Sequence, residues 1–490
     1  MRKPSCGSIL LLLLLLTLPV ADAFGQNRKV ELKIEPYVFE NAAGEKVEAE
    51  LGKFKVPENR NDPRSRLIEL SFVRFKSTAE RPGSPIVYLA GGPGGSGSGT
   101  ARGTRFPLFM AMREVADVIA FDQRGTGMSE PELLCREKFI YPTDKVPDAA
   151  LALEIYRRES RACLEDFRRK GADLAGYNTE QSADDLEDLR LALGAEKISL
   201  WAISYGTHLS LDAIKRHEKS IDRAILAGVE GLQHTIKLPS SIEAHLEHLD
   251  RLAKADPKIR EKIPSLIGLM KEVLEKVERE PAMVEVTDPV SKEKVKVTVN
   301  RFVLQLLTAF AFGSGENALP RYYYEMSKGD FSRVAAQWLR ITNSGQPIGS
   351  AMSFMMDCYS GISPERRKRV EKEAKTALLG DVMNFPFPEV CTAWGEPDAG
   401  EDFRREIVKT KVPTLFISGT LDVRTPPGNA EEVRRGFPDS RHLIIEGAVH
   451  SDPLFLSSPQ IKEAMLDFMK GKRVSTTRIE LEPLRFLPLD

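Results

Sequence analysis

The chain has 490 residues and a mass of 54.6 kDa, and 42% of its residues are hydrophobic. This composition provides enough apolar side chains for a sizeable buried core and excludes a broadly disordered chain. Lys and Arg number 70 and Asp and Glu number 71, so the net charge is -1. A balanced charge does not support a nucleic-acid-binding protein or a protein held on membranes by basic residues, so we expect no nucleic-acid partner.

The first 23 residues have the pattern of a secretory signal peptide. Arg2 and Lys3 give a basic start, an apolar run follows at 9–20, and residues 21–23 form an A-x-A cleavage pattern. The run is shorter than the apolar segment that a transmembrane helix requires. We therefore expect an exported protein, periplasmic or extracellular, without a stable membrane span once the signal is removed. An uncleaved N-terminal anchor is the alternative.

Four cysteines follow the predicted signal and allow three disulfide pairings. An oxidising compartment favours bridges over free thiols. The pairing with the shortest loops joins Cys135 to Cys163 and Cys358 to Cys391, but the sequence does not choose among the three. Four buried free thiols are the alternative. Because no Cys-x-x-Cys motif or Cys/His cluster occurs, we expect no structural zinc site.

Strand and helix patterns alternate through the first half of the chain. Residues 47–56 and 66–76 alternate apolar and polar side chains and are predicted strands. Short apolar runs, typical of buried parallel strands, follow at 85–90, 117–121, 197–203 and 223–228. Helical patterns lie at 149–169 and 180–193. This alternation predicts an α/β fold with a mainly parallel sheet.

The pattern changes after residue 232. Residues 240–280 and 300–345 are predicted helices with a charged interlude at 283–300, and 350–400 is irregular. Strands return at 412–418 and 441–446, with a helix at 427–436 between them. We therefore expect a large, mostly helical insertion that forms a lid or substrate domain. The predicted domains are a first core part at 24–231, the lid at 232–400, a second core part at 401–472 and a tail at 473–490.

Ser204 lies in a nucleophile-elbow pattern between a predicted strand and a predicted helix. Ala202 and Gly206 are the small residues that the tight turn requires two positions before and after the serine. Chance occurrence is the alternative, because a short motif of this kind is weak without its strand and helix context.

A glycine-rich loop, residues 91–97, directly follows the strand at 85–90. Glycines allow backbone amides to approach an oxyanion. A phosphate loop fits less well because no Gly-Lys-Ser/Thr follows. A flexible linker also fits poorly, because the preceding strand is strongly apolar.

Asp422 and His450 each follow a predicted strand in the second core part. The chain order Ser204, Asp422, His450 is the order of an α/β-hydrolase catalytic triad. A turn aspartate and a surface histidine are the ordinary alternatives. None of the other six histidines follows the last predicted strand.

Together these loops resemble the α/β-hydrolase superfamily. More narrowly, they are similar to the prolyl iminopeptidase and tripeptidyl aminopeptidase group of serine exopeptidases (peptidase family S33). The matching stretches are 91–97, 121–129, 182–190, 204–207, 413–427 and 447–450. Ala90 stands where prolyl iminopeptidases have histidine, so the resemblance does not imply a preference for proline. Ala202 stands where the family has glycine.

The resemblance implies a serine exopeptidase that acts on peptides through an acyl-enzyme, without a metal or an organic cofactor. The backbone amides of Gly92 and Tyr205 are expected to hold the oxyanion, while Asp122 and Arg124 are expected to fix a loop beside the site. An acidic side chain is needed for the substrate's α-ammonium group. The candidates are Glu230, Glu316, Glu325 and Asp357. An esterase or lipase acting on small esters has the same triad, and a catalytically inactive binding protein is a third possibility.

Overall fold

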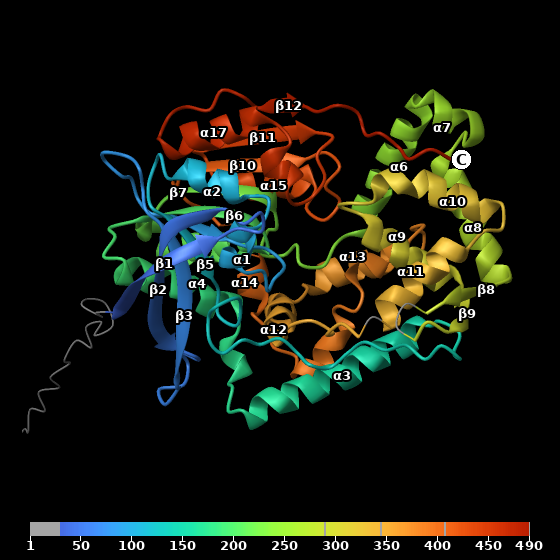
Figure 1. The fold of residues 1–490 in the computed structure, drawn as a ribbon, viewed down its shortest axis with the longest axis horizontal. Coiled ribbons are helices and arrows are strands. Elements are labelled where there is room, and N and C mark those ends of the chain that lie inside the picture. Colours follow the sequence, from blue (N-terminus) through green and yellow to red (C-terminus); the bar gives the residue numbers. More distant parts are fainter. Residues whose placement is uncertain (1–29, 289–290, 344, 406–407, 490) are drawn as a thin grey trace, which may run out of the picture.

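The computed structural model describes residues 30–288, 291–343, 345–405 and 408–489, and the predicted signal peptide lies outside this part. Ten strands form one sheet in the order β1-β2-β3-β5-β4-β6-β7-β10-β11-β12 (Figure 1). Their bounds are β1 Leu32–Glu40, β2 Lys46–Pro57, β3 Leu67–Phe75, β4 Ile86–Leu89, β5 Val118–Asp122, β6 Ile198–Ser204, β7 Ile221–Val229, β10 Thr414–Gly419, β11 Ser440–Glu446 and β12 Arg478–Glu480.

The sheet is parallel from β5 to β12. The first three strands form an antiparallel meander, and β3 joins β5 in antiparallel pairing, for example Phe72 opposite Phe121. All later neighbours pair in parallel. Because parallel strands end at the same edge of a sheet, the loops after β4, β6, β10 and β11 meet there. These are the loops in which the sequence predicts the chemistry.

Helices cover both faces of the sheet because successive side chains of a strand point to opposite faces. On β4, Val87 and Leu89 belong to one buried cluster, whereas Ile86 and Tyr88 belong to another. The first cluster is covered by α4 (Thr179–Ala192), α5 (Tyr205–His217) and α15 (Pro427–Arg434), and the second by α1 (Gly97–Arg102), α2 (Phe106–Met112), α16 (Pro453–Leu456) and α17 (Pro459–Met469).

A helical body with its own core lies beside the sheet (Figure 1). Its helices are α6 Pro239–Ala255, α7 Pro257–Lys262, α8 Leu266–Arg279, α9 Arg301–Ala311, α10 Leu319–Ser327 and α11 Ser332–Asn343. Leu421 and Val423, which flank Asp422, belong to the same buried cluster. The helical body therefore packs directly on a loop of the predicted active site.

Two further segments join the helical body to the sheet. The long helix α3 (Ala149–Arg169) runs beneath both parts (Figure 1), with Ile155 in the helical cluster and Leu164 in the sheet cluster. The C-terminal tail crosses from β12 to α6 and α7, where residues 483–489 lie along a groove. The backbone N–H of Leu487 donates to the carbonyl of Asn317 at 2.9 Å.

The predicted α/β-hydrolase fold with its mainly parallel sheet is confirmed, and four segments differ from the sequence prediction in detail. The charged interlude is a hairpin of β8 (Ala282–Thr287) and β9 (Lys294–Val299). The segment predicted to be irregular contains α12 (Ala351–Ser360) and α13 (Pro364–Ala374). Strand β1 was missed because most of its side chains are exposed and give no apolar alternation. Strand β12, with three residues, was too short for a pattern.

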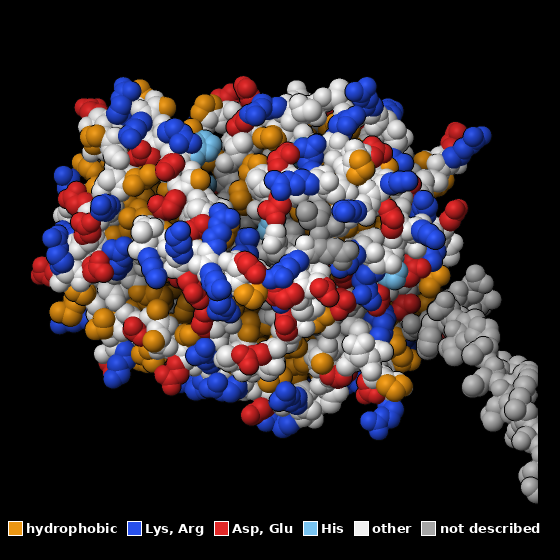
Figure 2. Space-filling model, turned by 180° about the vertical axis from the view of Figure 1, so that it is seen from behind, with side chains coloured by type: hydrophobic (Ala, Val, Ile, Leu, Met, Phe, Trp, Pro, Cys, Tyr) orange, Lys and Arg blue, Asp and Glu red, His pale blue; other side chains and the backbone are white. Residues whose placement is uncertain are grey.

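Within the described residues, no helix is long and apolar enough to cross a membrane. Basic and acidic side chains are interspersed over the face that Figure 2 shows. This mixture agrees with the balanced composition. On the face shown, the basic side chains do not form the continuous basic surface to which nucleic acids bind.

Candidate active site

Ser204 ends β6 and begins α5 in the strained conformation of a nucleophile elbow. Its φ of 56° and ψ of -129° lie outside the ordinary range for a residue with a side chain. The turn leaves no room for larger neighbours, since a Cβ on Gly206 would lie 2.3 Å from the carbonyl oxygen of Leu89. The predicted tight turn is therefore present, and it holds the serine at the edge where the strands end.

The glycine loop after β4 lies against Ser204. A Cβ on Gly91 would lie 2.7 Å from the Cβ of Ser204, so only glycine allows this approach. Asp122, at the end of β5, fixes the loop from behind: its carboxylate accepts hydrogen bonds from the hydroxyls of Ser96 and Ser98, each at 2.6 Å. Arg124 lies elsewhere, paired with Asp185.

Asp422 and His450 contact each other as the chain order predicts. The carboxylate of Asp422 is buried and lies 2.8 Å from Nδ1 of His450. Burial alone raises the pKa of Asp422, but the charge and hydrogen bond of His450 and the bonds from Thr425 outweigh it, so the pKa is lowered. Because Nδ1–H donates to this carboxylate, Nε2 is the nitrogen that is left to accept a proton.

Thr425 completes this arrangement, and sequence patterns did not single it out. Its hydroxyl donates to Asp422 at 2.6 Å and lies 3.1 Å from His450 Nδ1. Its backbone N–H also donates to Asp422, at 2.9 Å. An Asp-x-x-Thr spacing is common in turns, so only the structure reveals the role.

Ser204 and His450 line one cavity of about 350 Å³. In the part of the chain that the structure describes, no hydrogen bond of 3.5 Å or less engages the Ser204 hydroxyl. Catalytic hydrogen bonds are often long without substrate and shorten in the reacting complex. The other described residues that line the cavity are Tyr88, Ala90, Gly91, Gly92, Gly95, Thr100, Arg105, Ile203, Arg424 and Ser451.

Two of the four predicted amine-binding carboxylates, Glu230 and Asp357, act electrostatically on Tyr205, the residue after Ser204. Glu230 follows β7 and is buried, with its carboxylate 3.0 Å from Lys237 Nζ. Asp357, on α12, is half-buried. Burial, reinforced by the charge of Glu230, raises the pKa of Asp357 well above its ordinary value. Glu230 differs: burial raises its pKa, but the charge of Lys237 outweighs that effect and the pKa is lowered.

The other two carboxylates are separate from this pair. Glu316 is buried in the loop before α10 and accepts a hydrogen bond from the backbone N–H of Gly313, and burial raises its pKa. Glu325, on α10, is paired with Arg321 at 2.8 Å and with Arg333 at 3.1 Å. These two ion pairs neutralise the Glu325 carboxylate within the helical body.

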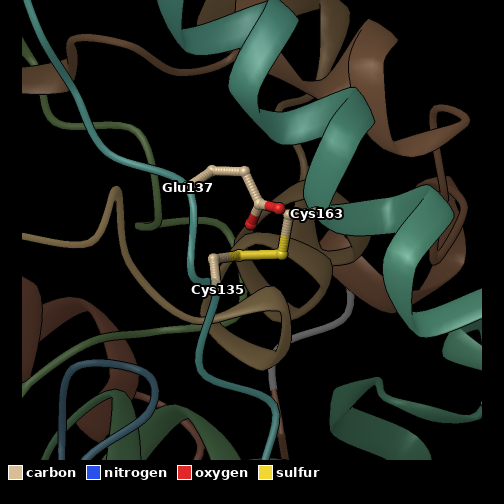
Figure 3. Close-up of side chains that lie close together, drawn as sticks. All are labelled: Cys135, Glu137 and Cys163. Carbon is tan, nitrogen blue, oxygen red and sulfur yellow. A yellow bond between two sulfur atoms is a disulfide. The ribbon is translucent and has the colours of Figure 1, made fainter. Parts of the chain in front are cut away.

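The cysteines form the two shortest-loop bridges, Cys135–Cys163 and Cys358–Cys391. Glu137 lies beside the first bridge (Figure 3), and its carboxylate is within 4.8 Å of both sulfurs. Since each sulfur is bonded to the other, neither is a free thiolate, and one carboxylate does not make a metal site. The second bridge fastens α12, the helix of Asp357, to the short 3-10 helix Glu389–Trp394.

Comparison with known proteins identifies the class. Residues 84–266 match the family model described as alpha/beta hydrolase fold, and residues 378–477 match a model described as TAP-like protein. The chain belongs to the α/β-hydrolase superfamily, and the predicted resemblance to the tripeptidyl aminopeptidase group is confirmed.

Named relatives are similar over different lengths. The putative hydrolase YuaR of Escherichia coli (strain K12) is 23% identical over 427 residues, which are 83% of this chain and 81% of that protein. The serine protease Hip1 of Mycobacterium tuberculosis (strain ATCC 25618 / H37Rv) is 30% identical over 187 residues, 36% of this chain and 35% of its own. The tripeptidyl aminopeptidase of Streptomyces coelicolor is 32% identical over 173 residues, 32% of this chain and 31% of its own.

The chain thus aligns with about a third of the length of the last two relatives. Among solved structures, Rv0554 from Mycobacterium tuberculosis aligns with a TM-score of 0.38 at 16% identity, covering 86% of this chain and 100% of that one.

Proposed function

We propose that this protein is an exported serine exopeptidase that releases N-terminal residues or short peptides. The observation that carries the proposal is the arrangement of three side chains. Ser204 stands on a strained elbow in the same cavity as His450, and His450 is held through Nδ1 by the buried Asp422. Export is supported by the signal-peptide pattern and by the two disulfide bridges.

In the proposed reaction, Ser204 Oγ attacks the carbonyl carbon of the scissile amide while His450 Nε2 takes the hydroxyl proton. The carbonyl electrons move onto oxygen, which the amides of Gly92 and Tyr205 are proposed to bind. His450 then gives the proton to the leaving nitrogen as the C–N bond breaks. Water then attacks the carbonyl carbon of the acyl-enzyme while His450 takes a proton from it. The ester bond to Ser204 breaks, and His450 returns the proton to Ser204 Oγ. Loss of one oxyanion donor typically costs about 3 kcal/mol of transition-state stabilisation.

Asp357 is the carboxylate that we propose for the substrate's α-ammonium group. It is half-buried, and no hydrogen bond or ion pair engages its side-chain carboxylate within the described residues, so the capacity of that carboxylate to accept hydrogen bonds is unused. The negative charge of Glu230 also acts on Asp357, although the ion pair of Glu230 with Lys237 offsets part of this effect. A substrate ammonium would lower the cost of ionising Asp357, whereas an acylated amine would not.

The test compares a peptide anilide with and without an N-acetyl group. We expect acetylation to lower kcat/KM by roughly 10²-fold or more, because it leaves a partly desolvated carboxylate without its ionic partner. In Asp357→Asn the two substrates should differ far less. Glu325→Gln is the matched control, since Glu325 is an acidic side chain of the helical body with partners of its own.

Two results would contradict the proposal. Equal kcat/KM for the free and acetylated anilides rejects the aminopeptidase. Hydrolysis of short acyl esters without hydrolysis of either anilide favours the esterase. Fluorophosphonate labelling tests the nucleophile separately, and we expect it on Ser204 and not in Ser204→Ala.

A further inference from the structure

The cavity beside Ser204 and His450 has a pronounced charge asymmetry. Its volume of about 350 Å³ lies within the range of small-ligand pockets, roughly 300–1,000 Å³. Arg105 and Arg424 line it, and none of its described lining residues is acidic. The cavity therefore presents positive charge next to the nucleophile.

The position of the cavity relates it to one side of the scissile bond. His450 and its neighbour Ser451 line the cavity, whereas Tyr205, Glu230 and Asp357 do not. His450 must face the leaving nitrogen in order to protonate it. If the amine binds at Asp357, as the proposed function holds, the cavity is on the leaving-group side.

Of the two arginines, Arg424 is the one available to a ligand. Arg105 is buried and already donates to Asp452, Tyr88 and Ser451. The half-buried Arg424 makes no hydrogen bond or ion pair within the described residues. Its charge acts on Glu316, but the two are not within the 4.0 Å of an ion pair.

The surroundings of Arg424 fix its place. A Cβ built on Gly313 would lie 3.8 Å from both Arg424 Nε and His450 Cβ, so the loop before α10 packs against both residues. The turn that carries Arg424 is held by the bonds from Thr425 to Asp422. These contacts place the Arg424 side chain beside the cavity, and its planar guanidinium loses less freedom for each hydrogen bond that it forms than a flexible ammonium group would.

We infer that this cavity receives the leaving part of the substrate and that Arg424 makes it favour a leaving part that carries a carboxylate. The inference rests on the proposed function, since it needs the acyl part to lie on the Asp357 side. The carboxylate can come from an acidic side chain or from the free C-terminus of a short peptide. Both present the planar oxygen pair that a guanidinium binds.

The experiment uses four free-amine peptides with the same acyl part. The first residue of the leaving part is Glu or Gln, and the C-terminus is a free acid or an amide. For the wild-type protein we expect one of the two carboxylates, the Glu side chain or the free C-terminus, to reach Arg424. Compared with its neutral counterpart, that carboxylate should raise kcat/KM by about 10-fold, the size of a single charge-assisted contact. Arg424→Gln should reduce that ratio to about 2-fold or less and Arg424→Lys should keep part of it, because lysine keeps the charge without the planar fork.

The readout is the acid-to-neutral ratio within one variant, so a general loss of activity does not imitate the effect. Arg435→Gln, an exposed arginine at the end of α15, should keep the wild-type ratio. Equal rates for all four peptides in the wild type overturn the inference, as does an unchanged ratio in Arg424→Gln. If the protein cleaves esters but none of the four peptides, the proposed function fails and the inference about Arg424 is tested with esters. Acyl esters whose alcohol part carries a carboxylate or a neutral amide are then compared in the same variants. An unchanged acid-to-neutral ratio there also overturns the inference.

Discussion

Arg105 donates a hydrogen bond from Nη2 to the hydroxyl of Ser451 at 3.0 Å, one residue beyond His450. The same guanidinium donates to Asp452 at 2.7 Å and to Tyr88, on β4, at 2.5 Å. Ser451 has a φ of 80°, which is unfavourable for a residue with a side chain. Arg105 thus ties the segment after His450 to the strand that precedes the glycine loop, and it holds a strained residue in place.

Replacement of Arg105 by alanine should lower kcat by roughly 10- to 100-fold while KM changes little, because a displaced His450 transfers protons poorly. The kcat of Arg105→Lys should lie between that of Arg105→Ala and that of the wild type. Steady-state kinetics and the rate of fluorophosphonate labelling measure the effect. Arg102→Ala is the control, being an exposed arginine on the preceding helix. A rise in KM without a loss of kcat would show that Arg105 acts on substrate binding alone.

Thr425→Val should lower kcat/KM by about 10-fold, since it removes a hydroxyl that donates to the buried Asp422 and leaves an acceptor unsatisfied. Thr425→Ser keeps the hydroxyl and should retain most of the activity. The pKa of Asp422 is lowered in the folded protein, so ionised Asp422 stabilises the fold at pH values above the pKa of an unfolded aspartate. This stabilisation is lost as the pH falls through the pKa of Asp422 in the folded protein. Acid unfolding of Thr425→Val should therefore begin at a higher pH. Equal activity of the Val and Ser variants would contradict this role.

The selectivity for a free amine should depend on pH through Asp357. Its raised pKa means that the carboxyl is protonated over a wider acidic range and cannot then pair with an ammonium group. The ratio of kcat/KM for free and acetylated anilides should fall as the pH is lowered through that value. In Asp357→Asn the ratio should not change with pH.

The same carboxylate should reduce stability at neutral pH. A group whose pKa is higher in the folded than in the unfolded chain stabilises the fold fully below its unfolded pKa, about 3.9 for aspartate, and this contribution is lost as the pH rises through the folded value. Asp357→Asn should therefore raise Tm at pH 7, by roughly 2 °C or more, and have less effect near pH 4. An unchanged Tm at pH 7 would argue against a costly unpaired charge at this position.

Opening the Cys358–Cys391 bridge should affect stability and selectivity together. The bridge closes a loop with a sequence separation of 33, for which chain entropy predicts a loss of about 3–4 kcal/mol when Cys358 and Cys391 are both replaced by serine. Because Asp357 is adjacent to Cys358, the variant should also discriminate less between free and acetylated amines. Denaturant unfolding and the two anilides measure these effects. A double serine replacement of Cys135 and Cys163 is the control, and it should leave the amine selectivity unchanged.

Patterns of local residues predicted the elements with a strong periodicity. The buried parallel strands and the elbow at Ser204 could be found because burial on both faces gives continuous apolar runs and a tight turn requires small residues. Thr425 and Arg105 could not be found in this way. Arg105 contacts Asp452, 347 positions away, and Thr425 contacts His450, 25 positions away, and no local spacing encodes such distances. The four acidic candidates were equivalent in sequence, and only burial and ion pairs separate Asp357 from Glu325.

The C-terminal tail has a mechanical consequence for how substrates enter. It leaves the sheet at β12, next to the strand that leads to His450, and it reaches the helical body at Asn317 and near α6 and α7, where Leu489 is buried. The helical body is thus fastened to the sheet at both ends of its own segment and again by this third strip of chain. A helical body fixed along three lines cannot rotate away from the sheet as a rigid unit unless one of them detaches. We therefore expect peptides to reach Ser204 through the cavity that it shares with His450, without a rigid-body movement of the helical body.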